Sequence, residues 1–220
     1  MSDTDLPALG RREARKIERR AAIVAVAERH FLDHGYDRTS MSAIAEQMGG
    51  SKGTLWSYFS SKEELFAAVI DKASAVFRLE VLGVLDTGGE LVDVLTSMSE
   101  RYILRLGSAD GIALQRLIIG EVERSPKIGQ IFYDRAAGVS RAHLSRFVAG
   151  RMLAGVLRQD DPDEAAEMLL GLCGGGYHQR VLWGVQTPDA GLAKREAALA
   201  VSQFLRCYRP TGEGANEHCD

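Results

Sequence analysis

The chain has 220 residues, of which 45% are hydrophobic and 26% are charged, close to the averages of globular proteins. This composition excludes wholesale disorder and leaves room for one large domain or two modest ones. The formal net charge of −3 excludes a uniformly basic nucleic-acid coat. The charges are unevenly placed, however, because residues 1–62 carry ten Lys and Arg against eight Asp and Glu, whereas acids outnumber bases in the remainder. The sequence therefore predicts a basic N-terminal arm on a mildly acidic body.

The three cysteines, Cys173, Cys207 and Cys219, are widely spaced. They imply no disulfide framework and form no CxxC pair for zinc or redox chemistry. The N-terminus is polar and lacks the apolar run of a secretory signal, and no stretch approaches the ~18 apolar residues that span a membrane. We therefore expect a reduced, cytoplasmic protein with no membrane partner, no cofactor and no bound metal.

Helical periodicity dominates the chain from its N-terminal part onward. Apolar residues at i, i+4, i+7 and i+8 predict a first helix over residues 11–34, which Gly35 can end in a left-handed conformation. Thr39-Ser40 supplies the expected N-cap of a short second helix that ends near Met48, and Ser51 is the expected cap of a third.

A capping box of Ser61 and Glu64 predicts the start of a fourth helix that reaches about Gly83, because each residue can satisfy a free backbone N–H of the other. Asp161 followed by Pro162 is another strong start signal. Five further helices are expected, near residues 90–106, 111–124, 128–158, 163–184 and 189–208. With about nine helices and no alternating strand pattern, the expected fold class is all-α.

Residues 40–59 match a helix-turn-helix, in which the second helix enters the major groove of DNA. Ala45 and Gly49 are small where the two helices must approach each other. The outer side of the second helix carries hydrogen-bonding or amphipathic groups, namely Lys52, Thr54, Trp56, Ser57 and Tyr58. On spacing alone, the same pattern also fits any two short helices of an all-α protein.

Two runs extend this motif: F-x-x-x-G-Y over residues 31–36, and TSMSAIAEQMGGSKGTLWSYFSSKEEL over residues 39–65. Over some fifty residues they resemble the N-terminal domain of TetR-family transcriptional regulators. The sequence departs from the family pattern at Gly50, where valine is usual, and at Trp56, where tyrosine is usual. The resemblance implies a DNA-binding transcriptional regulator, most often a repressor, and not an enzyme.

The resemblance also implies which residues meet DNA. Ser42 would face a phosphate or a base edge, Gly53 would allow close approach of the backbone, and Lys62 would pair with a phosphate. The other contacts would come from the third helix, through Lys52, Thr54, Trp56, Ser57 and Tyr58.

A basic run opens the first helix and comprises Arg11, Arg12, Arg15, Lys16, Arg19 and Arg20. By the same resemblance, Arg11, Arg12 and Arg15 would lie along or in the adjacent minor groove and add salt-dependent affinity. The interleaved Glu13 and Glu18 also fit a solvated helix face that contacts no DNA.

The C-terminal part carries four runs of interest: residues 116–121, Ser125-Pro126, residues 131–133 and residues 161–166. They more loosely resemble the effector-binding and dimerisation domain of the same family, in its subgroup of efflux-gene repressors. The resemblance implies a homodimer that pairs through its last two helices, with candidate contacts at Leu169, Leu172, Gly176, Val181, Leu199 and Phe204. Close approach at the dimer seam and local bending both explain the glycine run at residues 174–176.

A partly apolar small-molecule effector is expected between the helices of this second part. The candidate lining residues are Phe77, Met98, Tyr102 and Trp183, and ordinary core packing is the alternative reading of each. Two isolated histidines, His143 and His178, are expected to be surface or satisfied core residues, and Cys173 is expected to be a small buried apolar residue.

We therefore expect a DNA-binding domain over residues 11–62 and an effector-binding and dimerisation domain over residues 63–208, with disordered ends at 1–10 and 209–220. The expected function is repression of transcription by a homodimer that binds a palindromic operator in double-stranded DNA and is released by the effector. The alternative is a DNA-binding dimer without a small-molecule effector.

A remote alternative is a serine hydrolase, because Gly49-Gly50-Ser51-Lys52-Gly53 matches the G-x-S-x-G motif. That motif works on a strained turn from a strand into a helix, whereas the residues before it have helical spacing.

Overall fold

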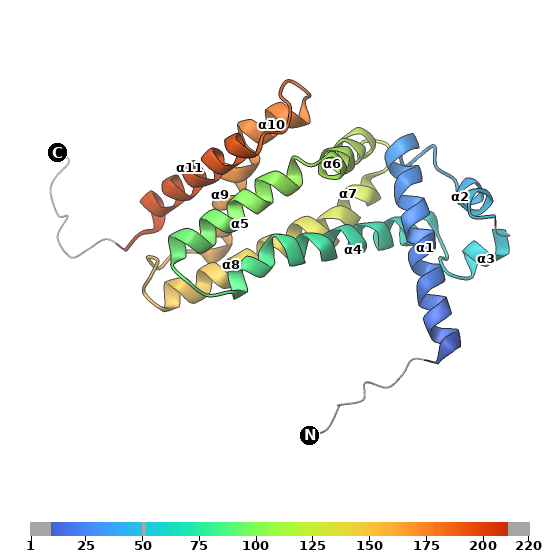
Figure 1. Ribbon diagram of the computed structural model, residues 1–220, viewed down its shortest axis with the longest axis horizontal. Coiled ribbons are helices and arrows are strands. Elements are labelled where there is room, and N and C mark those ends of the chain that lie inside the picture. The colour runs from blue at the N-terminus through green and yellow to red at the C-terminus, as the bar shows by residue number, and fades with distance from the viewer. Residues whose placement is uncertain (1–9, 50–51, 211–220) are drawn as a thin grey trace. The chain divides into compact units, whose positions relative to one another are not determined.

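The computed structural model describes residues 10–49 and 52–210, with Arg11 and Lys52 described by their backbone alone. Within these ranges the regular structure is entirely helical and contains no strand, which confirms the all-α fold class. Eleven α-helices follow one another along the described chain (Figure 1): α1 Arg11–His34, α2 Met41–Gln47, α3 Lys52–Trp56, α4 Lys62–Glu80, α5 Leu91–Leu106, α6 Ala109–Glu121, α7 Pro126–Phe132, α8 Gly138–Leu153, α9 Pro162–Gly174, α10 Tyr177–Leu182 and α11 Ala190–Tyr208. A 3-10 turn at Leu82–Asp86 follows α4, and a π-helical turn at Tyr133–Ala137 joins α7 to α8.

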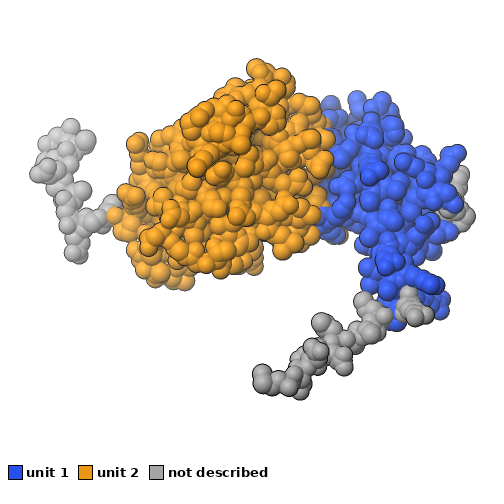
Figure 2. Space-filling view, in the orientation of Figure 1, with its two compact units in different colours: residues 1–72, 117–131 blue, residues 73–116, 132–220 orange. Residues whose placement is uncertain are grey.

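The chain divides into two compact units (Figure 2). Unit 1 takes residues 1–72 and 117–131, and unit 2 takes residues 73–116 and 132–220. Unit 1 thus contains a segment, 117–131, that the predicted boundary after residue 62 assigns to the effector-binding part. This division describes packing, so the assignment of DNA binding and effector binding to residues 11–62 and 63–208 stays a prediction.

The core of unit 1 is built around three aromatic rings that come from α1, the following loop and α4. Phe31, Tyr36 and Phe66 are at most 4% exposed, and their ring centroids lie 5.2 to 5.6 Å apart. Helix α1 ends where the sequence predicts, because Gly35 follows it with φ of 84° and donates its N–H to the carbonyl of Phe31 at 3.0 Å. The rings therefore fix α4 against the end of α1, within unit 1.

Two of the predicted helix caps in this unit can be checked. Of the predicted pair Thr39-Ser40, Ser40 is the N-cap of α2, where its hydroxyl accepts the N–H of Ala43 at 3.1 Å. The Thr39 hydroxyl instead donates to the carbonyl of Gly35 at 2.7 Å. At the start of α4, Ser61 accepts the N–H of Glu64 at 3.0 Å, but the Glu64 carboxylate accepts the N–H and hydroxyl of Ser60, both at 2.7 Å, rather than the N–H of Ser61. The predicted reciprocal box is therefore wrong in its second half. The two hydrogen bonds from Ser60 lower the pKa of Glu64.

Unit 2 is a bundle in which α11 lies along α5 and α8 lies along α9. Asp161 caps α9 as predicted, since its carboxylate accepts the N–H groups of Asp163 and Glu164 at 2.7 and 3.2 Å. Helix α11 begins at Ala190 after an N-cap by Asp189, whose carboxylate accepts the N–H of Leu192 at 2.7 Å. This start lies just after the predicted one.

Two long helices of the sequence prediction are each split in the structure, which accounts for eleven helices in place of about nine. The predicted helix 163–184 breaks after α9, because Gly175 is extended and Gly176 has φ of 44° before α10 begins. A break fits the cost of three successive helical glycines, about 1 kcal/mol each. The predicted helix 128–158 is interrupted by the π-helical turn and ends at Leu153.

Candidate nucleic-acid interface

Helices α2 and α3 pack against each other in unit 1 and form the predicted two-helix motif. Ile44 and Ala45 of α2 are buried, as is Leu55 of α3, so apolar contacts hold the two helices together. Gly49 in the turn has φ of 61°, a conformation that favours glycine. Gly50 and Ser51, and with them the predicted cap by Ser51, lie outside the described residues.

Helix α3 is five residues long, from Lys52 to Trp56, and so is shorter than predicted. Gly53 and Ser57 are exposed, and Trp56 is 50% exposed, whereas Thr54 and Tyr58 are half-buried. The Ser57 hydroxyl donates a hydrogen bond to the carbonyl of Thr54 at 2.7 Å, and its lone pairs stay available. The indole of Trp56 thus presents an amphipathic ring beside exposed backbone and a hydroxyl. This combination can meet phosphates and base edges.

Ser42 and Lys62, the other predicted contacts of the motif, lie on α2 and at the start of α4. Ser42 is half-buried, one residue after the first residue of α2. The Lys62 ammonium donates to the carbonyls of Tyr36 and Asp37 at 3.0 and 3.5 Å and lies 4.2 Å from the centre of the Tyr36 ring. Lys62 therefore clamps the loop between α1 and α2, a role that its sequence position does not reveal.

The same loop carries a strongly perturbed phenol. Burial, together with the carboxylates of Glu63 and Asp37, raises the pKa of Tyr36 to about 12. The phenol therefore stays neutral at ordinary pH, and its ring offers an electron-rich face to the Lys62 ammonium.

The basic arm is the first part of α1. The side chains of Arg12, Arg15 and Lys16 are exposed, and none of them ion-pairs within the described part of the chain. Arg20 instead places its guanidinium 4.8 Å from the centre of the Phe59 ring, behind α3. Arg12, Arg15 and Lys16 are therefore available for phosphates, whereas Arg20 joins α1 to Phe59, which follows α3.

Of the predicted effector residues, the structure brings together three and separates one. Met98 is buried in the core of unit 2, and Phe77 and Tyr102 pack against that core with their ring centroids 5.7 Å apart. Burial raises the pKa of Tyr102, so its phenol is neutral. Trp183 caps the end of α10 and is 67% exposed, so it does not line the same interior as the other three.

Buried polar groups that the sequence reading treated as isolated also lie in this unit. His178 is 4% exposed, its Nε2 lies 2.9 Å from Oε1 of Gln115, and its Nδ1 has no partner among the described residues. Burial lowers the pKa of His178 and raises the pKa of Cys173 to about 11. Cys173 is 2% exposed, which confirms it as a small buried residue.

The six predicted dimer contacts divide into two groups. Leu169, Val181 and Phe204 are at most 4% exposed and belong to the core of unit 2 itself, so they are not on its surface. Leu172, Gly176 and Leu199 are exposed, with Leu172 at 40% and Leu199 at 54%. Core and surface positions alternate along the same helices, and apolar character alone does not separate them.

Three other features were compared with the described residues: a metal site, a membrane-spanning helix and the G-x-S-x-G match. No group of three metal-ligating side chains gathers there, and none of the described helices is both long and apolar enough to cross a bilayer. The segment before the G-x-S-x-G match is helix α2 and not a strand, while Gly50 and Ser51 of the match lie in the undescribed gap.

Two family models match the chain. Residues 23–69 match the model described as bacterial regulatory proteins of the tetR family. Residues 93–210, more than half of the chain, match the model described as the AefR-like transcriptional repressor, C-terminal domain.

Individual relatives and solved structures point to the same family as the two models. The chain is 40% identical to the DNA-binding transcriptional repressor TetR of Mycobacteroides abscessus over 39% of this chain and 43% of that protein, so it spans less than half of that relative. The match to the activator FasR of Mycolicibacterium smegmatis likewise covers 32% of its length, at 39% identity over 30% of this chain. A TetR-family regulator from Mesorhizobium loti superposes with a TM-score of 0.79 at 26% identity, over 89% of this chain and 99% of that one. The Flavonoid-responsive Regulator FrrA superposes with a TM-score of 0.77 at 29% identity, over the same shares. The family models, relatives and folds agree that the chain belongs to the TetR family of transcriptional regulators.

Proposed function

We propose that the chain is a transcriptional repressor that binds a palindromic DNA site as a homodimer and leaves it when a small molecule binds in unit 2. The observation that carries the DNA-binding part is the outer side of α3. There Gly53 and Trp56 of the helix and Ser57 directly after it are exposed, and the buried Leu55 anchors the inner side of the helix. A helix presented in this way is what major-groove recognition requires.

The basic arm supports the same proposal. Arg12 and Arg15 have no carboxylate partner among the described residues, so their charges are available for phosphates. Phosphate contacts of this kind supply affinity and orientation, while base contacts from α3 would supply sequence preference. Substitutions in the arm should therefore lower the affinity for every duplex, whereas substitutions on α3 should change the sequence preference.

A homodimer is supported by exposed apolar side chains on α9 and α11, two helices that pack together. Met168 and Leu172 of α9 are each 40% exposed, and Leu199 of α11 is 54% exposed. Exposed apolar side chains on adjacent helices are typical of a protein–protein interface. This face replaces Leu169, Val181 and Phe204 of the sequence prediction, which are buried within unit 2.

Release by an effector requires a connection between the two units, and the chain provides one. Residues 117–131 pack in unit 1, yet the chain continues from both of their ends into unit 2. A rearrangement of unit 2 around an effector would thus displace residues 117–131, which pack in the same unit as α2 and α3. By linkage, DNA and effector must weaken each other's binding by the same factor, typically about 5–150-fold.

The interior around Met98, Phe77 and Tyr102, with a neutral phenol at Tyr102, favours an uncharged, partly apolar effector. FrrA is by name a flavonoid-responsive regulator, which is consistent with an effector of this chemistry. The second candidate function is a DNA-binding dimer without an effector, and it is favoured by the tight packing of Met98, which is 0% exposed.

The test is selection of bound fragments from a random duplex pool by the purified chain at about physiological salt. We expect a palindrome whose half-sites are about one helical turn, or a multiple of it, apart. Failure to enrich any sequence would contradict operator binding by the free chain. The enriched duplex then serves to screen for molecules that dissociate it, and an effector whose affinity does not change with this duplex would contradict induced release.

A further inference from the structure

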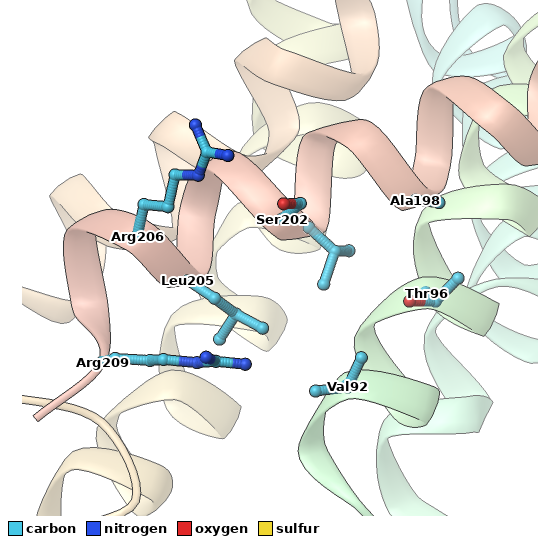
Figure 3. A pocket seen from close by; sticks show the side chains of 8 residues that line it. Val92, Thr96, Ala198, Ser202, Leu205, Arg206 and Arg209 are labelled. Atoms are coloured by element: carbon cyan, nitrogen blue, oxygen red, sulfur yellow. The ribbon is translucent and has the colours of Figure 1, made fainter.

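A groove of about 330 Å³ lies between α5 and α11 of unit 2 (Figure 3). Val92 and Thr96 of α5 line one side of it. The other side is lined by residues of α11 and its C-terminal end, namely Ala198, Val201, Ser202, Leu205, Arg206 and Arg209. Its size is at the lower end of sites for small organic ligands, roughly 300–1,000 Å³. We propose that this groove binds a small organic carboxylate with an apolar body.

The floor of the groove suits the apolar body. Val201 and Leu205 are buried to 1% and 5% exposure, and Val92 faces them while remaining 45% exposed. The hydroxyls of Thr96 and Ser202 form no hydrogen bond with any residue that the structure describes, and they can add a polar contact beside the apolar surface. A ligand that covers Val92 and the floor would gain the free energy of apolar burial.

Two arginines supply the charge complementarity. No acidic side chain lines the groove, and neither Arg206 nor Arg209 ion-pairs with another residue in the described ranges. In Figure 3 the Arg209 side chain extends beneath Leu205 toward Val92, whereas Arg206 points away from Val92. A guanidinium binds a carboxylate through two parallel hydrogen bonds. Arg209 is therefore the anchoring group, and Arg206 adds positive charge at the rim.

The groove shares no lining residue with the surfaces used in the proposed function. Ala198, Ser202 and Leu205 follow one another at i, i+4 and i+7, so they form one stripe of α11 on the side of α5, and Arg209 follows at the C-cap of the helix. Leu199 does not line the groove; of the lining residues, Arg206 lies nearest to its stripe, at i+7, whereas Arg209 lies on the side of α5. The groove also shares no lining residue with the interior around Phe77 and Met98.

The experiment is titration of the full chain with octanoate by calorimetry, with 1-octanol as the uncharged match. Octanoate binds, and octanol binds at least about tenfold more weakly, since it lacks the charge-assisted hydrogen bonds. Arg209→Gln weakens octanoate binding by about tenfold and Arg206→Gln by less. Arg195→Gln removes an equal charge from the exposed side of α11, outside the groove, and leaves binding unchanged.

The proposal is overturned by no octanoate binding, by equal binding of octanoate and octanol, or by equal loss in Arg195→Gln and Arg209→Gln. A groove-filling variant, Ala198→Trp, must also abolish binding, which locates the site independently of charge. Octanoate binding that appears only in a chain ending at Pro210 would mean that the acidic residues beyond it, Glu213, Glu217 and Asp220, occupy the groove, and would overturn the proposal too. DNA binding by Arg209→Gln stays at the wild-type level, so a failure here is distinct from a failure of the proposed function.

Discussion

The Ser125 hydroxyl donates a hydrogen bond to Oδ1 of Asp37 at 2.8 Å, across 88 positions of sequence. It joins the turn between α6 and α7 to the loop between α1 and α2, both within unit 1. Four residues earlier, Glu121 is 8% exposed and places Oε1 against Gly35 at the end of α1. Residues 117–131 are thus hydrogen-bonded to the loop between α1 and α2 at Asp37 and lie close to the end of α1 at Gly35.

The first prediction concerns the close approach of Glu121 to Gly35. A Cβ at this position would lie 2.5 Å from Oε1 of Glu121, and the backbone has φ of 84°, so Gly35→Ala meets both a steric clash and a strained backbone. We expect the free energy of unfolding to fall by about 2 kcal/mol or more, measured by urea denaturation. Adding Glu121→Ala removes the clash but not the strain, so it restores part of the loss. Full restoration would show that the backbone strain is negligible, contrary to this account.

The second prediction concerns Lys62, whose ammonium contacts the Tyr36 carbonyl and ring. Lys62→Met should lower the free energy of unfolding by about 1–2 kcal/mol, because it removes a cation–π contact and a hydrogen bond. The same variant tests the phosphate contact predicted from sequence, since loss of one phosphate contact lowers the slope of log K against log salt by about 0.9. Reduced stability with an unchanged salt slope would assign Lys62 a purely structural role.

The third prediction concerns the basic arm. Arg12→Gln and Arg15→Gln should weaken binding to every duplex to a similar extent and should each reduce the salt slope by about 0.9. Arg29→Gln, exposed farther along the same helix, is the matched control and should change neither quantity. Fluorescence anisotropy over a range of salt concentrations measures both. A change of sequence preference in Arg12→Gln or Arg15→Gln would contradict a backbone-contacting arm.

The fourth prediction concerns the dimer face. Leu172→Gln combined with Leu199→Gln should yield monomers in sedimentation velocity, because both side chains are exposed on neighbouring helices of the proposed interface. Leu79→Gln changes a residue of α4 that is 79% exposed and should leave the assembly unchanged. Wild-type monomers, or dimers that survive the double substitution, would remove α9 and α11 as the interface.

The fifth prediction concerns His178, whose pKa is lowered by burial. The folded state therefore favours the neutral ring, while the unfolded state binds a proton near pH 6.5. The contribution of the neutral His178 ring to the free energy of unfolding is fully present above about pH 6.5. It is lost as the pH falls from there toward the lowered pKa of His178 in the folded state. Urea midpoints at pH 7.5 and 5.5 should thus differ more in the wild type than in His178→Gln. Equal differences would mean that His178 carries no such linkage.

Local features of the fold were predictable from sequence because their causes are local. The caps at Ser40 and Asp161 need only a side-chain oxygen two or three residues before a free N–H, and both form. The helix end at Gly35 follows from its freedom to adopt positive φ. The break at residues 174–176 was missed because the apolar periodicity continues across it, and the glycines outweigh that pattern.

Contacts between distant residues were not predictable in this way. Nothing near Lys62 in sequence indicates that it lies on Tyr36, twenty-six positions earlier. Leu169 and Leu172 are similar in chemistry and three residues apart, yet one is fully buried and the other 40% exposed. Periodicity identifies an apolar face, but only packing decides whether the same chain or a partner covers it.

The most direct test of the central claim, that α3 enters the major groove, is photo-crosslinking from position 57. Cys207 and Cys219 are first replaced by Ser, and Ser57→Cys is then labelled with a photoreactive group and mixed with the selected duplex. We expect crosslinks to bases at two symmetry-related positions of the palindrome, and none from the exposed control Asp86→Cys. A labelled chain that binds the duplex but crosslinks no base from position 57 would contradict the account.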